Sequence, residues 1–295
     1  MERSVTGYLG SVNRWECDEN DHLNVRHFAV KANEALGNAL EHFYPETTLE
    51  LVSQHIRFLT EARVAVPLAG RATLHGSPDP ATDSVVVSVE LINPVSGTLH
   101  AAFVSTLRLP PDTERHDYLP LREEAAPKGL PTDTQRFAEQ SLTAAYAAGM
   151  WDISYGRVAL AESLVDDDGS ARLAPEHVIG RVSDGMAHLW SRVRGSAESG
   201  EPQDRQRGEF GGAALEYHID FAASVDLGEQ VRVVSGVEAY GNKTLTFRHL
   251  LYGADASRPA ARMLVVAVSM DLGARRAIAI PDEQRQRLDA LLLRS

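Results

Sequence analysis

The residues best suited to chemistry stand in one short stretch, Trp15 to Phe28, which reads WECDENDHLNVRHF. It holds two aspartates, two glutamates, two asparagines and two histidines. Carboxylates and imidazoles serve most often as general bases and acids. The crowding therefore indicates either a cap for a following helix or a site of proton transfer.

An amphipathic helix follows this stretch, over residues 24–43. Its apolar residues recur at spacings of four, four, four and three, which makes one apolar stripe of Phe28, Ala32, Leu36, Leu40 and Phe43. Asp18, Asp21 and Asn24 are all good helix caps. One helix needs one cap, so the whole set of polar groups favours chemistry at the helix entrance.

The elements around this helix repeat once along the chain. A strand at 6–17 precedes it, and strands at 49–59, 63–76, 83–94 and 97–109 follow. Residues 111–148 read as a Pro-rich and charged linker with a short helix at 135–149. The second half repeats the order, with a strand at 151–164, a helix at 176–193, strands at 214–224, 229–241, 243–254 and 261–273, and a closing helix at 282–295.

This order predicts an α+β fold with two domains, residues 1–110 and 149–295. Strands that follow one another as hairpins give antiparallel sheets, and one helix per unit implies that each curved sheet wraps a single helix. That architecture is the hot-dog fold.

The opening stretch resembles the 4-hydroxybenzoyl-CoA thioesterase family and the acyl-ACP thioesterases. Their pattern is D-x-N-x-H-V-N-N-x-x-Y, with a Glu about two turns further on. Val25 stands where that family often has a second Asn, Phe28 replaces a Tyr, and Asp21 stands where Gly is common. The resemblance covers the first 110 residues, and its matching positions are Asp18, Asn20, His22, Leu23, Asn24 and Glu34.

The resemblance implies an acyl-thioester hydrolase. Asp18 would be the general base or nucleophile, and Asn20 and His22 would orient a water or polarise the carbonyl. A helix N-terminus supplies unpaired N–H groups and partial positive charge. The backbone N–H of Asn24 or Val25 would therefore hold the oxyanion, and the family pattern favours Val25.

Other side chains take lesser roles. Glu34, nearly three turns down the helix, could hold a water. Arg26 and Arg57 are candidate substrate-binding residues, because an anionic thioester such as acyl-CoA needs local cations. His27 and Cys17 are read as structural, and no thiol nucleophile is proposed.

The second half matches in element order but not in motif. Its helix entrance reads VDDDGSARLAPEH, which is longer by five to seven residues. We therefore expect a degenerate partner domain. Our alignment pairs His177 with His22, Arg181 with Arg26, Ile179 with Asn24 and Leu189 with Glu34.

Composition restricts the partners. Among 295 residues the net charge is −12, which disfavours nucleic acid and anionic membranes. The single cysteine excludes an intrachain disulfide, and no long apolar segment stands out. We expect a cytoplasmic protein without metal or cofactor, acting on acyl-CoA or an acyl-carrier-protein thioester. A homodimer of double hot dogs is compatible with the resemblance.

Two rival functions stay open. A hot-dog hydratase or dehydratase would carry D-x-N-P-x-H, but here the spacing from Asp18 to His22 is one residue shorter and the Pro is absent. A non-catalytic acyl-CoA-binding protein is the other rival, because the motif is lost in the second half. The DDDG at 166–169 lacks the spacing of a calcium loop.

Overall fold

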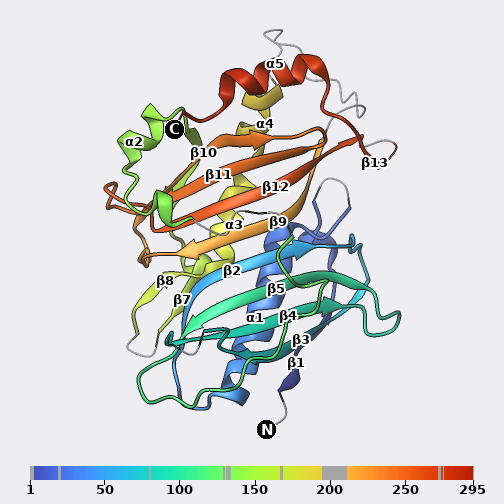
Figure 1. Cartoon of the computed structure of the whole chain (residues 1–295), viewed down its shortest axis with the longest axis vertical. Helices are drawn as coiled ribbons and strands as arrows, with labels where there is room; N and C mark the ends of the chain where they lie inside the picture. The colour runs from blue at the N-terminus through green and yellow to red at the C-terminus, as the bar shows by residue number, and fades with distance from the viewer. Residues whose placement is uncertain are drawn as a thin grey trace. The chain divides into compact units, whose positions relative to one another are not determined.

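The computed structural model describes residues 3–18, 21–79, 81–128, 130, 134–166, 169–194, 211–271, 274 and 276–294. The chain forms two compact units. Unit 1 is Met1–Gly129 with Tyr217–Phe221, and unit 2 is Leu130–Glu216 with Ala222–Ser295. Each unit holds antiparallel strands and its own helical segment against them (Figure 1).

Unit 1 is a curved antiparallel sheet that holds one long helix. The strands run in the order β1-β3-β4-β5-β2. The helix α1 lies against β1, β3 and β4. This is the arrangement expected from the hairpin order of the sequence. The elements are β1 (Ser4–Ser11), α1 (Val25–Phe43), β2 (Glu50–Phe58), β3 (Pro67–Gly76), β4 (Ser84–Ile92) and β5 (Leu99–Arg108).

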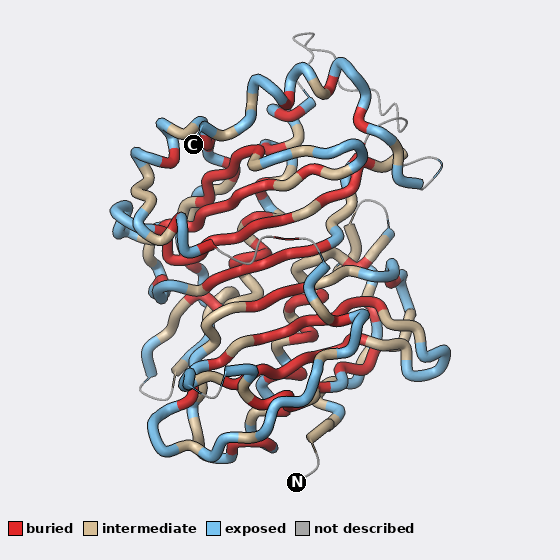
Figure 2. The backbone as a smooth tube through the Cα atoms, in the orientation of Figure 1, coloured by how far each residue is buried: buried red, intermediate tan, exposed pale blue. Residues whose placement is uncertain are grey.

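The buried face of α1 carries the predicted stripe. Phe28, Ala32, Leu36 and Phe43 are buried, while Leu40 is half-buried. The Phe28 ring meets the edge of Phe58 at a centroid distance of 5.6 Å. Burial follows the strands and this helix face along the whole unit (Figure 2).

Unit 2 repeats the plan with a shorter, broken helix. Its strands run in the order β9-β12-β11-β10-β6, with β13 on β12, and β7 and β8 form a separate hairpin. Residues Tyr217–Phe221 of β9 are the part grouped with unit 1. The elements are β6 (Trp151–Arg157), β7 (Ser163–Val165), β8 (Ala171–Leu173), α3 (Pro175–Asp184), α4 (Met186–Arg194), β9 (Gly211–Phe221), β10 (Gln230–Tyr240), β11 (Thr244–Tyr252), β12 (Ala261–Asp271), β13 (Arg276–Ala277) and α5 (Asp282–Leu291).

Several predicted boundaries are wrong for local reasons. The strands predicted at 6–17 and 151–164 end at Ser11 and Arg157, because short 3₁₀ turns, η1 (Arg14–Glu16) and η3 (Leu160–Glu162), follow them. The strand predicted from residue 63 begins at Pro67, because Ala65 has a φ of +67° in the preceding turn.

The predicted helix 176–193 breaks at Gly185. A Cβ atom there would lie 2.8 Å from Ile153, so only glycine permits the close approach of helix and β6. Glycine is also a poor helix former. The result is two short helices in place of one.

The predicted linker packs onto the sheets. In unit 1 the Leu119 N–H donates to the His75 carbonyl at 2.7 Å. In unit 2 the linker forms η2 (Gln135–Phe137) and α2 (Leu142–Ala147), and Phe137 and Ala145 join a buried cluster on the sheet.

The contact between α1 and the sheet yields the first prediction. A Cβ atom at Gly7 would overlap the carbonyl oxygen of Ala35, whereas one at Gly37 would meet no atom within 4 Å. Gly7→Ala should lower the free energy of unfolding by about 1–3 kcal/mol, because overpacking shifts the helix.

Gly37→Ala is the matched control. It should raise stability by roughly 0.5–1 kcal/mol, since Ala is the better residue inside a helix. Urea unfolding of both variants measures this. Equal effects of the two substitutions would contradict the packing described for α1.

Candidate active site

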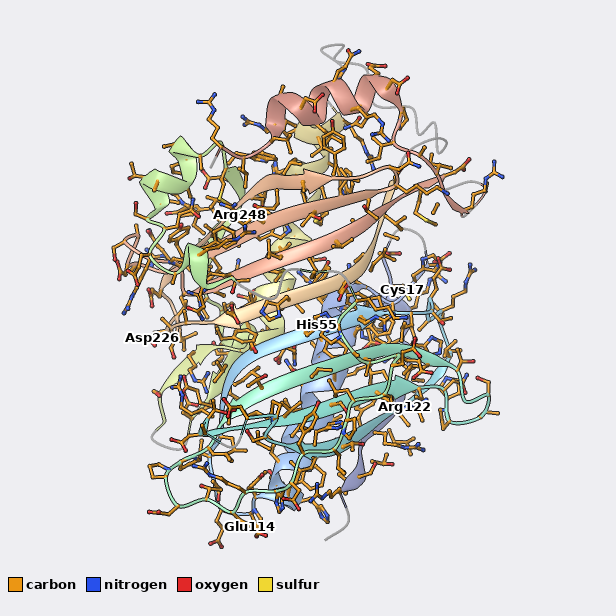
Figure 3. The ribbon with its side chains drawn as sticks, viewed as in Figure 1. Cys17, His55, Glu114, Arg122, Asp226 and Arg248 are labelled. Atoms are coloured by element: carbon orange, nitrogen blue, oxygen red, sulfur yellow. The ribbon has the colours of Figure 1, made fainter. Side chains whose placement is uncertain are left out.

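The polar stretch forms a closed loop between η1 and α1. Cys17 pairs with Leu23 as an isolated antiparallel bridge. Inside the loop the Asp18 N–H donates to the His22 carbonyl at 2.8 Å, and the Asp18 carboxylate accepts the His22 N–H at 3.2 Å. Asn20 lies outside the described residues. Asp18 is therefore held at the start of the loop, three residues after Trp15, and Figure 3 labels its neighbour Cys17.

The helix is capped by Asn24. Its side chain accepts the Arg26 N–H at 3.0 Å, and its carbonyl accepts the His27 N–H at 2.9 Å. The cap of α1 is therefore Asn24. Among the described residues no group accepts a hydrogen bond from the Val25 N–H, the first of the helix.

His22 is held by a residue that the motif does not contain. Its Nε2 lies 2.9 Å from a carboxylate oxygen of Glu61, and the Arg63 guanidinium lies 3.8 Å from the same oxygen. His22 also bridges to Arg63 through the backbone. The pairing joins segments almost forty residues apart, so spacing within the motif could not reveal Glu61.

A buried ion pair supports the loop from beneath. The Lys31 ammonium, on the buried face of α1, donates to Glu16 at 2.7 Å and to the Tyr8 hydroxyl at 3.1 Å. Glu16 also accepts the Asn13 N–H on its carboxylate and the Asn24 N–H on its carbonyl. Both ends of the loop are thus tied to one carboxylate residue.

The same pair shifts the titration of its members. Burial raises the pKa of Glu16, but the hydrogen bonds from Asn13 and Lys31 outweigh burial and hold this pKa below its ordinary value. Burial lowers the pKa of Lys31, but its hydrogen bonds to Glu16 and Tyr8 outweigh burial and raise it. Both groups are therefore charged near neutral pH.

Cys17 is unsuited to nucleophilic attack. Burial, followed by the negative charges of Asp18 and Asp21, raises the pKa of its thiol. Its Sγ contacts the Asn13 carbonyl at 3.5 Å. A thiolate is the reactive form of cysteine, so this environment favours the structural reading.

Three further residues that the sequence analysis proposed for the site lie at different distances from the loop. Glu34 is exposed and lies nine residues after Val25, about 13.5 Å along the helix axis, so α1 does not bring it to the entrance. Arg57 donates to the carbonyls of residues 123, 124 and 126 and ties the linker to β2. Arg26 stands in the first turn of α1, beside the loop.

Unit 2 repeats the hydrogen bonds of this helix entrance, by which we mean the segment from the 3₁₀ turn to the first turn of the helix. Glu162 accepts the Ala159 N–H and binds Arg181, as Glu16 accepts the Asn13 N–H and binds Lys31. The Ala174 N–H donates to the Glu162 carbonyl at 2.9 Å, as the Asn24 N–H does to Glu16. The two entrances are therefore built on one plan.

These shared bonds correct the sequence alignment of the halves. From residue 16 to 24 the first entrance has seven intervening residues, and from 162 to 174 the second has eleven, so the insertion is four residues. The predicted insertion of five to seven residues was too long. The corrected pairs are His177 with His27, Arg181 with Lys31, Ala174 with Asn24 and Asp184 with Glu34.

Among the described residues, four positions of the first entrance carry different residue types in the second. The β7–β8 ladder pairs Leu164 with Arg172, where the first loop pairs Asp18 with His22. Proline has no N–H, so the start of α3 also lacks the donor that α1 offers. The four replacements are Leu164 for Asp18, Arg172 for His22, Ser224 for Glu61 and Pro175 for Val25.

Comparison with known proteins identifies the fold. A candidate oleoyl thioesterase from Lactobacillus plantarum is 12% identical with a TM-score of 0.58, and the alignment covers 91% of this chain and 96% of that one. An acyl-ACP thioesterase from Bacteroides thetaiotaomicron is 8% identical with a TM-score of 0.56, and the alignment covers 90% of this chain and 97% of that one. The 12:0-ACP thioesterase from Umbellularia californica is 9% identical with a TM-score of 0.54, and the alignment covers 90% of this chain and 94% of that one. The α+β fold of two tandem hot-dog domains is thereby confirmed.

A family model gives the class. Residues 178–288 match the model of the Thioesterase-like superfamily. Comparison with curated protein sequences finds no relative. The fold and the family model together indicate a thioesterase of the hot-dog class, whose reaction is thioester hydrolysis. Except for Tyr217–Phe221, the matched residues lie in unit 2, whereas the acid–base residues predicted from the sequence stand in unit 1.

Among the helices in the described ranges, none has the length and apolar character to cross a bilayer.

The Glu16–Lys31 pair yields the second prediction. Lys31→Met should lower the free energy of unfolding at pH 7 by about 3 kcal/mol, because it leaves a buried carboxylate without its cation. Lys31→Arg is the control and should retain most of the stability, since Arg181 fills the same place in unit 2. The folded-state pKa of Glu16 lies below its ordinary value of 4.5. The stability that the ionised Glu16 contributes is therefore fully present above about pH 4.5 and is lost as the pH falls through the folded-state pKa.

Urea unfolding at pH 7 and at pH 3 measures both effects. The difference between wild type and Lys31→Met should shrink at the lower pH. A Met variant as stable as the wild type at pH 7 would show that the pair does not hold the loop.

Proposed function

We propose that the protein hydrolyses acyl thioesters at the entrance of α1, with Asp18 as general base or nucleophile. One observation carries this proposal: the two entrances share their supporting hydrogen bonds, yet Leu164, Arg172 and Pro175 stand in the second at the positions of Asp18, His22 and the Val25 N–H in the first. Capping accounts for Asn24, and packing accounts for Glu16 and Lys31. Neither accounts for Asp18, His22 and Glu61.

The reaction needs a base, an oxyanion donor and a leaving thiol. As base, the Asp18 carboxylate takes a proton from a water whose oxygen attacks the thioester carbonyl. The resulting oxyanion accepts the Val25 N–H and lies at the positive end of α1. Collapse of the tetrahedral intermediate breaks the C–S bond, and the thiolate takes the proton. The products are a carboxylic acid and a free thiol.

The nucleophilic route uses the same groups. Asp18 would attack the carbonyl directly and expel the thiolate, and water would then hydrolyse the mixed anhydride. In either route His22, oriented by Glu61, polarises the carbonyl or directs the water. Arg26 in the first turn would meet an anionic part of the substrate.

The substrate class is an acyl-CoA or an acyl-carrier-protein thioester. The similar proteins from Bacteroides and Umbellularia are named for the carrier-protein substrate. Measuring thiol release over acyl-CoAs of graded chain length, and over matched acyl-carrier proteins, identifies the carrier.

Asp18→Asn tests the assignment. The amide oxygen can still accept the His22 N–H, so the melting temperature should stay nearly unchanged. Loss of the base should reduce thioester hydrolysis by on the order of 10²–10⁴. Thiol release gives the rate and circular dichroism gives the melting temperature.

Asp166→Asn is the matched control. Asp166 binds Arg172 in the corresponding hairpin of unit 2, and its loss should leave turnover within a few-fold of wild type. Wild-type turnover by Asp18→Asn would refute the catalytic role. An equal loss in both variants would mean that unit 2 also takes part.

A further inference from the structure

A cavity of about 780 Å³ lies in unit 2, on the face of the sheet away from α4. Phe247 of β11 packs edge-on against Trp190 of α4 at a centroid distance of 5.8 Å. Arg248, the next residue on the strand, therefore points to the opposite face, because side chains alternate along a strand. There it meets the segment that carries η2 and α2; Figure 3 labels it.

The cavity is centred on two arginines that share one carboxylate. Arg248 is only 8% exposed, and its guanidinium lies 3.7 Å from the centroid of Phe137. Arg248 pairs with Glu238, and Arg136 binds the same carboxylate at 2.8 Å. Among the described residues the Arg248 Nε has no hydrogen-bond acceptor.

The charge in the cavity is positive. Arg294 is a third lining cation, and Glu139 is the second lining anion. Three arginines and two glutamates leave a formal charge of +1 in a chain whose net charge is −12. Burial lowers the pKa of Arg248 despite the attraction of Glu238. The same guanidinium donates to the Gln140 side-chain oxygen at 3.4 Å.

Apart from Gln140, the remaining lining residues are apolar. Phe137, Ala144, Ala147 and Leu293 line the space beside the arginines. A guanidinium binds a carboxylate through two parallel hydrogen bonds. Ligand sites of roughly 300–1,000 Å³ with mostly apolar walls and few polar groups are typical of small-molecule binding.

We propose that this cavity binds a small amphipathic carboxylate, an apolar chain that ends in a carboxylate held by Arg248 and Arg136. The carboxylate binds the guanidinium groups of Arg248 and Arg136 from the cavity side, and the chain lies along Phe137, Ala144 and Leu293. The site uses no residue of the Asp18 loop and does not depend on the proposed hydrolysis.

Isothermal titration of the full chain with octanoate tests the site. Arg136→Gln, which changes a partly exposed side chain, should weaken binding about tenfold, because it removes one charge-assisted hydrogen bond. Arg248→Met should abolish it. Arg258→Gln alters an exposed arginine that pairs with Asp255 and should bind as the wild type does.

Comparison ligands separate the parts of the proposal. Octylamine should not bind, and inorganic phosphate should bind more weakly than octanoate. Asp18→Asn should bind octanoate as tightly as the wild type. The proposal is overturned by unchanged affinity in Arg136→Gln, by phosphate binding as tightly as octanoate, or by loss of octanoate binding in Asp18→Asn. Arg136→Gln keeps the test decisive should Arg248→Met fail to fold.

Discussion

The buried pair of Glu16 and Lys31 is the interaction on which the loop of the candidate active site depends. Lys31 reaches Glu16 from the buried face of α1, and Glu16 holds the 3₁₀ turn at one end of the loop and the Asn24 N–H at the other. A buried pair stabilises only when further hydrogen bonds satisfy both partners. Tyr8 and Asn13 supply those bonds here, so loop, helix and first strand are positioned together.

Unit 2 shows which features of the entrance are structural. It keeps the carboxylate–cation pair with Glu162 and Arg181, and it keeps the 3₁₀ turn and the backbone bond to the helix start. It replaces Asp18 with Leu164 and begins its helix with Pro175. The retained residues build the loop in both units, and the lost ones are those expected to handle a thioester.

Much of the fold follows from periodicity, and less of the site does. The spacing of Phe28, Ala32 and Leu36 predicts α1 within a residue, and the hairpin order predicts both sheets. Local signals failed where a single contact decides the structure. Gly185 breaks its helix because of its approach to Ile153, which a hydrophobic pattern cannot express.

The site shows the same limit. The motif located Asp18 and His22, but Glu61 reaches His22 only through the fold. The sequence alignment of the halves failed because a four-residue insertion lies in the turn of the β7–β8 hairpin, and the Asp-Gly pair there signals a turn without fixing its length. Only the repeated hydrogen bonds of Glu16 and Glu162 restore the register.

The central claim is that the first N–H of α1 stabilises the oxyanion, and Val25→Pro measures it directly. Proline is well tolerated at this helix position, as Pro175 shows in unit 2, and Asn24 already has the extended backbone that a following proline requires. Loss of one oxyanion donor costs on the order of 10²–10³ in turnover. The account predicts that loss in thiol release with the melting temperature preserved. A folded Val25→Pro protein with wild-type turnover would contradict it.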